Sequence, residues 1–262
     1  MTLSAEQRYA RTHFYINKYF KITSNKTDHI LEWGDFKIAL PDDFFSKESS
    51  MLSFLTVFFD IIYPNQVRFP IPFIVIEGSY EKFGVRLQED DYVVDAGAHV
   101  GVFSVDASRK IGPQGKVFSF EPIPAINAIL KNQTKYTASD NIIANTEALG
   151  AKKGATTYRF SDEKTSSSAE NSEGESIDVT ITTLDDYVKE HKIEKINFIK
   201  MDIEGSEIAA LTGATETIKR FKPRLSICIY HRPGDPEAIK RLILDMRPDY
   251  QHAMTKWKIY AW

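Results

Sequence analysis

Short apolar segments rich in β-branched residues alternate with helical segments after about residue 86, and no other feature constrains the fold more. The segments predicted to be buried strands are 92–96, 116–120, 141–149, 196–201 and 224–230. Helices are expected between them, and this alternation is typical of parallel βαβ units. A closing hairpin expected at 250–262 adds an antiparallel edge. The chain should therefore form an α/β fold with a mostly parallel seven-stranded sheet.

The first part of the chain has a different character. Ser4 and Gln7 fit a capping box at the start of a helix, and Gly34 with Asp35 predicts the turn of a hairpin. We expect residues 1–78 to form a helical and hairpin extension that serves as a cap, a lid or a homodimer arm. The remaining domain, 79–262, should contain an inserted hairpin at 151–181 that carries an acidic, serine-rich loop.

Composition and charge exclude several classes of protein. A net charge of −3 and a pI near 6.1 argue against a dedicated nucleic-acid binder. The single cysteine, Cys228, excludes an internal disulfide and any multi-cysteine metal site. The most apolar segments, 51–63 and 69–76, are too short to span a bilayer, and the N-terminus has no apolar signal segment. We therefore expect a cytoplasmic protein with neither a membrane nor a nucleic-acid partner, and a buried helix within 51–63.

Polar or acidic residues follow all five of the alternating strands. These groups are 95–101, Glu121 with Pro122, Glu147 with Ala148, 202–205, and Tyr230 with His231. In an open parallel sheet, ligands bind beyond the carboxyl ends of the strands. The sequence therefore predicts that these groups meet in one binding site.

The loop after the first strand limits the kind of ligand. A dinucleotide fingerprint that starts at Gly97 needs glycine at positions 99 and 102, where this chain has His99 and Val102. What remains is an Asp-x-Gly-x-x-x-Gly pattern at 95–101, with an acid, Glu121, twenty residues later. An acid at that place accepts hydrogen bonds from ribose hydroxyls. A ligand with a ribose, a cationic end and no phosphate fits best, and S-adenosylmethionine is such a ligand.

Four segments make this assignment more specific. YVVDAGAHVGVFS at 92–104 resembles motif I of class I methyltransferases, and VFSFEP at 117–122 resembles their second-strand acidic motif. With ITTLDDY at 181–187 and INFIKMDIEGSEIAALTGA at 196–214, the chain resembles the FkbM family of S-adenosylmethionine-dependent methyltransferases. The resemblance spans about 78–232 and implies a Rossmann-like class I methyltransferase fold. It also implies O-methylation of a small molecule, natural product or glycan.

The resemblance implies roles for individual residues. The residues that it places at the cofactor are Glu81, Asp95, Gly97, His99, Gly101, Glu121, Pro122, Glu147, Ala148 and Asp202. The acid and the two glycines of 95–101 would shape the pocket for the methionine end, and Glu121 would bind the ribose. Glu147 and Ala148 would border the adenine, and Asp202 would lie beside the methionine and the methyl acceptor. Glu81 would reach the cofactor's ammonium group.

Methyl transfer to oxygen needs an aligned donor and acceptor and a group that removes the acceptor proton. His231 follows the fifth strand and Asp202 the fourth, and adjacent strands lie ~4.8 Å apart. We expect His231 to be the general base, oriented by Asp202 or Glu204. The alternative is that His231 only begins a turn. A divalent cation at these three residues is disfavoured, because the set suits magnesium poorly, so no metal ligand is predicted.

Other functions remain open at this point. A non-catalytic binding protein could retain the same fold, although acids after so many strands argue against it. A nicotinamide-dependent oxidoreductase is disfavoured by His99 and Val102. An amine methyltransferase of nucleic-acid bases is also disfavoured, because MDIEG stands where an Asn/Asp-Pro-Pro-aromatic motif is expected.

Overall fold

The computed structural model describes residues 4–46, 51, 54–59, 77–136, 140–160 and 175–262. Its centre is a seven-stranded sheet in the order β12-β13-β11-β10-β4-β5-β6. The strands are β4 (Tyr92–Ala96), β5 (Lys116–Phe120), β6 (Ile142–Asn145), β10 (Phe198–Met201), β11 (Arg224–Cys228), β12 (His252–Met254) and β13 (Lys258–Ala261). Neighbours from β6 to β11 are parallel, whereas β13 is antiparallel to β11 and β12. The predicted parallel sheet with an antiparallel edge is confirmed.

Both faces of this sheet are buried, because apolar side chains of successive residues alternate between two cores. Val93 belongs to one core and Val94 to the other. The first core includes α4 (Val102–Ile111) and is flanked by α5 (Pro124–Gln133). The second includes α6 (Leu184–Glu190), α7 (Glu207–Thr212), α8 (Thr215–Phe221) and α9 (Asp235–Met246). The sheet is therefore the middle layer of an α/β sandwich.

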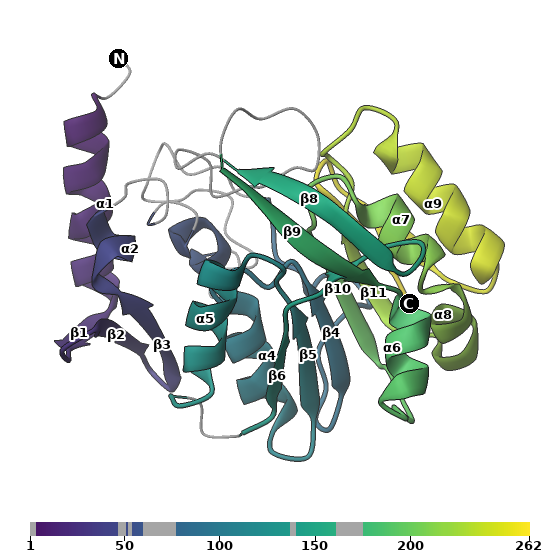
Figure 1. Cartoon of the computed structure of the whole chain (residues 1–262), viewed down its shortest axis with the longest axis horizontal. Coiled ribbons are helices and arrows are strands. Elements are labelled where there is room, and N and C mark those ends of the chain that lie inside the picture. Colours follow the sequence, from purple (N-terminus) through teal and green to yellow (C-terminus); the bar gives the residue numbers. More distant parts are fainter. Residues whose placement is uncertain (1–3, 47–50, 52–53, 60–76, 137–139, 161–174) are drawn as a thin grey trace.

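The N-terminal elements pack on the α4 and α5 side, at the end of the molecule opposite α9 (Figure 1). They are α1 (Ala5–Tyr19), α2 (Asp42–Ser46) and a separate antiparallel sheet of β1 (Lys21–Ser24), β2 (Asp28–Trp33) and β3 (Phe36–Pro41). The predicted Ser4–Gln7 capping box and the turn at Gly34 are present. Gln133 of α5 joins the two parts, since its buried amide accepts from Ala39 N and donates to Ala39 O. Residues 54–59 are helical and contribute Phe54 and Phe58 to the same core.

The inserted hairpin consists of β8 (Gly154–Phe160) and β9 (Glu175–Thr182), which are antiparallel as expected. The loop predicted between them lies outside the described residues. The single strand expected at 141–149 is wrong. The chain leaves the main sheet after Asn145, and β7 (Ala148–Leu149) pairs with β9 instead. This departure is stabilised by Asn127 of α5, which donates hydrogen bonds to the carbonyl oxygens of both Asn145 and Glu121.

Glycines lie at two helix boundaries. Gly213 separates α7 from α8, and a Cβ there would lie 2.0 Å from the carbonyl oxygen of Gly150. The N-cap of α9 is Gly234, and Asp235 is its first helical residue. Among the described helices, none has the length and apolar character needed to cross a bilayer.

Candidate active site

A pocket opens at the carboxyl ends of β4, β5 and β10, where the sequence predicted a binding site. Its empty volume is about 1100 Å³ with its open mouth included, which suits a nucleoside-sized ligand. The strand ends contribute residues 96–99, 120–123, 147–149 and 202–204 to its wall. The opposite wall comes from earlier in the chain, through Phe54, Val57 and Tyr80. Tyr158 of the inserted hairpin also lines it.

The turn after β4 brings the ends of three strands together. Gly97 has a φ of +76°, and a Cβ there would lie 1.9 Å from the carbonyl oxygen of Asp202. The amides of Gly97 and Ala98 both donate to the carbonyl oxygen of Phe120. Only glycine allows so close an approach in this conformation. Gly101, at a φ of +93°, packs against Leu130 of α5 instead, so its contribution is to the packing behind the pocket.

Asp95 is fully buried and is not on the pocket wall. Its Oδ1 lies 2.9 Å from Nζ of Lys200, and its Oδ2 accepts a hydrogen bond from Ser104. The same Lys200 ammonium donates to the carbonyl oxygens of Ala96 and Gly97. Asp95 therefore acts on the pocket through Lys200, which ties β10 to the glycine turn.

Glu121 presents a buried carboxylate to the pocket. Its Oε1 accepts from the amide of Ile123 and its Oε2 from the amide of His99, both at 3.0 Å. Burial raises the pKa of Glu121 to about 7, although the two amides and Lys200 favour the ionised form. Each oxygen has a further lone pair, so the carboxylate can accept hydroxyl groups of a bound ribose.

Asp202 is the most densely contacted acid of the site. Tyr80 donates to its Oδ2 at 2.7 Å, and Tyr230 donates to its Oδ1 at 3.5 Å. Burial alone would raise the pKa of Asp202, but the charges of Lys200 and Lys258 and the Tyr80 hydrogen bond outweigh burial and lower it. The carboxylate of Asp202 therefore stays ionised near neutral pH.

Glu204 and His231 lie beside Asp202. Glu204 is on the pocket wall at a φ of +54°, with its side chain 39% exposed. Burial and the neighbouring charge of Asp202 raise the pKa of Glu204 to about 7. His231 Nε2 lies 3.4 Å from Asp202 Oδ1 and 3.5 Å from Glu204 Oε2, while Nδ1 lies 3.0 Å from Glu207 Oε1. Burial disfavours the imidazolium, yet these three acids raise the pKa of His231 to about 9.

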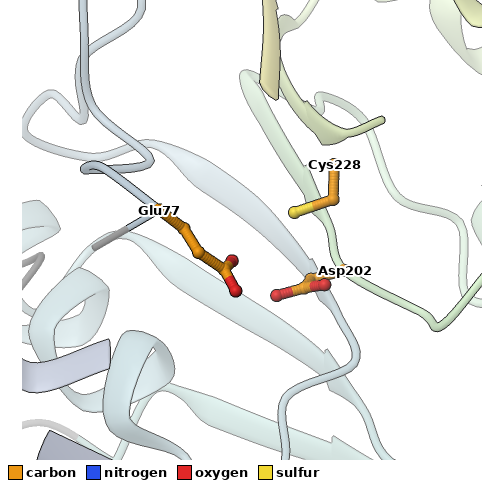
Figure 2. A group of neighbouring side chains, drawn as sticks. All are labelled: Glu77, Asp202 and Cys228. Carbon is orange, nitrogen blue, oxygen red and sulfur yellow. The ribbon is translucent and has the colours of Figure 1, made fainter. Parts of the chain in front are cut away.

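Two groups of side chains have the atoms of metal ligands within 4.8 Å of one another. In the first, the carboxylates of Glu77 and Asp202 point toward each other beside the sulfur of Cys228 (Figure 2). Lys258 is fully buried, and its Nζ lies 3.6 Å from Oε2 of Glu77. Its positive charge therefore compensates the negative charge of this group. The second group contains Asp202, Glu207 and the protonated His231. Because cations of the protein already serve both groups, we assign no metal ligand among the described residues.

Most of the residues predicted at the cofactor lie on the pocket wall. These are Gly97, His99, Glu121, Pro122, Glu147, Ala148 and Asp202. Asp95, Gly101 and His231 lie behind the wall. Glu81 does not agree with its predicted role, because its Oε1 accepts from the amide of Leu87 and its Oε2 pairs with Lys110. These contacts hold Glu81 away from the pocket.

Several important residues were missed in the sequence. They are Glu77, Tyr80, Lys200, Glu207 and Lys258. A signal existed for Lys200, since it interrupts the otherwise apolar strand Phe198–Met201 and a buried lysine needs a partner, whereas Lys258 only begins its strand. Tyr80 and Glu77 both lie before β4, more than 100 residues from Asp202 in the sequence. No local pattern therefore connects them with Asp202.

Comparison with known proteins agrees with this geometry. The model of the Methyltransferase FkbM domain matches residues 95–254. Methyltransferase sdnD of Sordaria araneosa is 23% identical over an alignment of 205 positions, and the match covers 66% of this chain and 79% of that protein. The hexuronic acid methyltransferase AglP of Haloferax volcanii is 24% identical over 161 residues, which are 61% of this chain and 64% of that protein.

A solved structure extends the agreement to the fold. The methyltransferase FkbM from Methylobacillus flagellatus KT superposes with a TM-score of 0.52 at 26% identity. The alignment covers 68% of this chain but only 44% of that one, so the present chain corresponds to less than half of its length. The fold is thus that of class I methyltransferases. Because the domain match spans more than half of the sequence, the chain belongs to the FkbM family of S-adenosylmethionine-dependent methyltransferases.

Proposed function

We propose that this chain transfers the methyl group of S-adenosylmethionine to a hydroxyl oxygen of a sugar or another small molecule. The observation that carries the proposal is Glu204, a carboxylate on the pocket wall whose pKa is raised to about 7, next to the ionised Asp202. General-base catalysis is most effective when the pKa of the base lies near the working pH. A carboxylate in this state can remove the proton of a hydroxyl acceptor.

The residues present fit S-adenosylmethionine. Glu121 offers a buried carboxylate for ribose hydroxyls, and Gly97 keeps the backbone beside it open. Asp202 and Glu204 place negative charge where the cationic methionine end is expected, beside Gly97. When bound, this cofactor supplies an electrophilic methyl group on its sulfonium. Binding, alignment and proton removal are the tasks of the protein.

The structure favours different roles for the trio that the sequence predicted. A histidine with a pKa of about 9 holds its proton near neutral pH and does not accept another. We therefore propose Glu204 as the base and His231 as the buried cation that holds Glu204 and Asp202 in place. Asp202, fixed by Tyr80, would line the path between donor and acceptor.

The acceptor class follows from charge and shape. Asp202 and Glu204 repel an anionic acceptor and accept hydrogen bonds from hydroxyl groups. Phe54 and Val57 give the opposite wall an apolar surface, which suits the face of a sugar ring or an aliphatic ring. We propose that residues 1–78 act as a cap over the acceptor. Neutral glycosides are therefore the first candidates, and uronic-acid glycosides are tested beside them because the relative AglP is named as a hexuronic acid methyltransferase.

Two measurements test this function. First, S-adenosylhomocysteine should raise the melting temperature, and stabilisation by NAD alone would overturn the assignment. Second, methyl transfer from radiolabelled cofactor is followed with neutral glycosides, uronic-acid glycosides and aliphatic alcohols. Binding of cofactor without transfer to any of these oxygen acceptors would favour the non-catalytic alternative.

The role of Glu204 is tested with Glu204→Gln, which keeps the shape of the side chain and removes its basicity. We expect kcat to fall roughly 10²- to 10⁴-fold. The affinity for S-adenosylhomocysteine should change by no more than about threefold, which corresponds to less than 1 kcal/mol. The matched control is Glu194→Gln, an exposed glutamate distant from the pocket lining, which should retain wild-type kcat. An unchanged kcat in Glu204→Gln refutes the assigned role.

A further inference from the structure

The first residue of α7, Glu207, is buried against His231. Only 1% of its surface is exposed. Its Oε1 accepts the amide proton of Ile203 at 2.8 Å and lies 3.0 Å from His231 Nδ1. Its Oε2 is buried and has no hydrogen-bond partner among the described residues. A buried carboxylate with one oxygen unsatisfied is costly, so a structural role at the helix terminus does not account for it well.

Each ring nitrogen of His231 lies within ion-pair distance of an acid. Its side chain is 7% exposed, with Nδ1 on Glu207 and Nε2 facing Asp202 Oδ1 and Glu204 Oε2 at 3.4 and 3.5 Å. The ring of Tyr230 packs on it with the centroids 4.2 Å apart. The observed orientation of the imidazole directs Nε2 at two acids of the pocket wall.

We infer that Glu207 is a positioning residue for methyl transfer: it orients the imidazole of His231, so that Nε2 faces Asp202 and Glu204 and holds them in their working positions. Neither Glu207 nor His231 lines the pocket. Glu207 reaches the carboxylates of Asp202 and Glu204 through the imidazole, and it also holds the backbone between them at the Ile203 amide. The effect on methyl transfer rests on the proposed role of Glu204, whereas the contact between Glu207 and His231 does not. The pair of Glu207 and His231 exists in the protein whatever the acceptor is.

Several elements contribute charged or titratable groups around this pair. The charged and titratable groups around His231 and Glu207 are Glu77 before β4, Tyr158 of β8, Asp202 and Glu204 after β10, Tyr230 and Arg232 after β11, and Asp235 of α9. Acids outnumber the one arginine, and Arg232 faces Asp235 through its backbone amide. Glu207 is the acid closest to the imidazole, so its removal should change His231 most.

The expected consequence has a definite sign. Removing the charge of Glu207 lowers the pKa of His231, since the remaining acids must then overcome its burial alone. A neutral His231 no longer lowers the pKa of Glu204, which should rise. The acid limb of the pH profile of kcat/KM should therefore move to higher pH in Glu207→Gln.

The direct test is NMR titration of His231 with labelled imidazole, using His231→Gln to assign its signal. In Glu207→Gln the midpoint should fall by about one unit or more, and Glu207→Asp should restore at least part of the shift. Glu216→Gln serves as the control, because this exposed helix glutamate does not contact the pair. An unchanged midpoint in a folded Glu207→Gln protein overturns the inference.

Kinetics then separate positioning from a purely structural role. Glu207→Gln should lower kcat at neutral pH roughly tenfold, and the loss should recover as the pH rises. In a His231→Gln background the same change should have little further effect, because the residue acts through the imidazole. A full additional loss in that background would show that Glu207 only stabilises α7. If no variant transfers methyl groups to any hydroxyl, the proposed function fails, while the NMR titration still decides the inference.

Discussion

The affinity for the cofactor should depend on pH through one buried group, Glu121. Its carboxylate is 6% exposed and accepts two backbone amides, and burial raises its pKa to about 7. The ionised form accepts ribose hydroxyls with both oxygens, whereas protonation removes one acceptor. Because the pKa is raised, the competent ionised fraction falls as the pH falls through 7. Affinity should therefore be high at pH 8 and low at pH 6.

The size of the effect follows from that value. With a pKa of about 7, roughly a tenth of the free protein is competent at pH 6 and roughly nine tenths at pH 8. The apparent Kd is the intrinsic Kd divided by the competent fraction, so it should change about tenfold, or ~1.4 kcal/mol, over this range. Binding near pH 7 should also release about half a proton per cofactor bound.

Isothermal titration calorimetry with S-adenosylhomocysteine at pH 6, 7 and 8, repeated in two buffers, measures both the Kd and the proton release. Glu121→Gln should bind more weakly at pH 8 and show a flat pH profile. Glu89→Gln, which changes an exposed glutamate, should behave as wild type. A wild-type profile that changes less than about twofold refutes the reasoning. So does a slope that persists in Glu121→Gln but disappears in Glu204→Gln.

Three other substitutions have defined outcomes. Lys200→Met should lower the free energy of unfolding, measured in urea, by about 3–5 kcal/mol, because it leaves Asp95 buried without its cation. Adding Asp95→Asn should recover part of this loss. A loss below about 1 kcal/mol in Lys200→Met contradicts a stabilising ion pair. Gly97→Ala should abolish cofactor binding in calorimetry, since its Cβ would lie 1.9 Å from the Asp202 carbonyl oxygen; a near-wild-type Kd contradicts this. Phe54→Ala should raise the KM of the acceptor with little change in cofactor Kd, and the opposite pattern in steady-state kinetics contradicts the cap.

Local patterns were sufficient for most of the elements. The strands Tyr92–Ala96 and Lys116–Phe120 appear with the predicted bounds, because apolar β-branched runs between turn residues are a short-range signal. The segment after Asn145 was the exception. The residues that follow Asn145 could extend the strand by their local pattern. Ala148 and Leu149 instead leave the seven-stranded sheet and pair with β9, and the local sequence does not indicate which of the two sheets they join.

The position of the site was accessible for a similar reason. Parallel strands end at one edge of a sheet, so the residues that follow them must meet there, and the glycine and acid pattern at 95–121 limits the ligand to an adenosine-type cofactor. The roles within the site were not accessible. Asp95 was expected to face the cofactor, yet it faces Lys200, and Glu81 was expected at the ammonium group, yet it pairs with Lys110.

The chain's pattern of apolar runs, glycines and acids was thus enough to predict the methyltransferase sheet and the edge at which its pocket lies. It was not enough to assign protons. Whether His231 or Glu204 is a base depends on which charges share a buried volume, and Glu207, Asp202 and Tyr80 reach that volume from separate elements. Electrostatic energies depend on distance and burial in three dimensions, and neither is encoded in the spacing of residues along the chain.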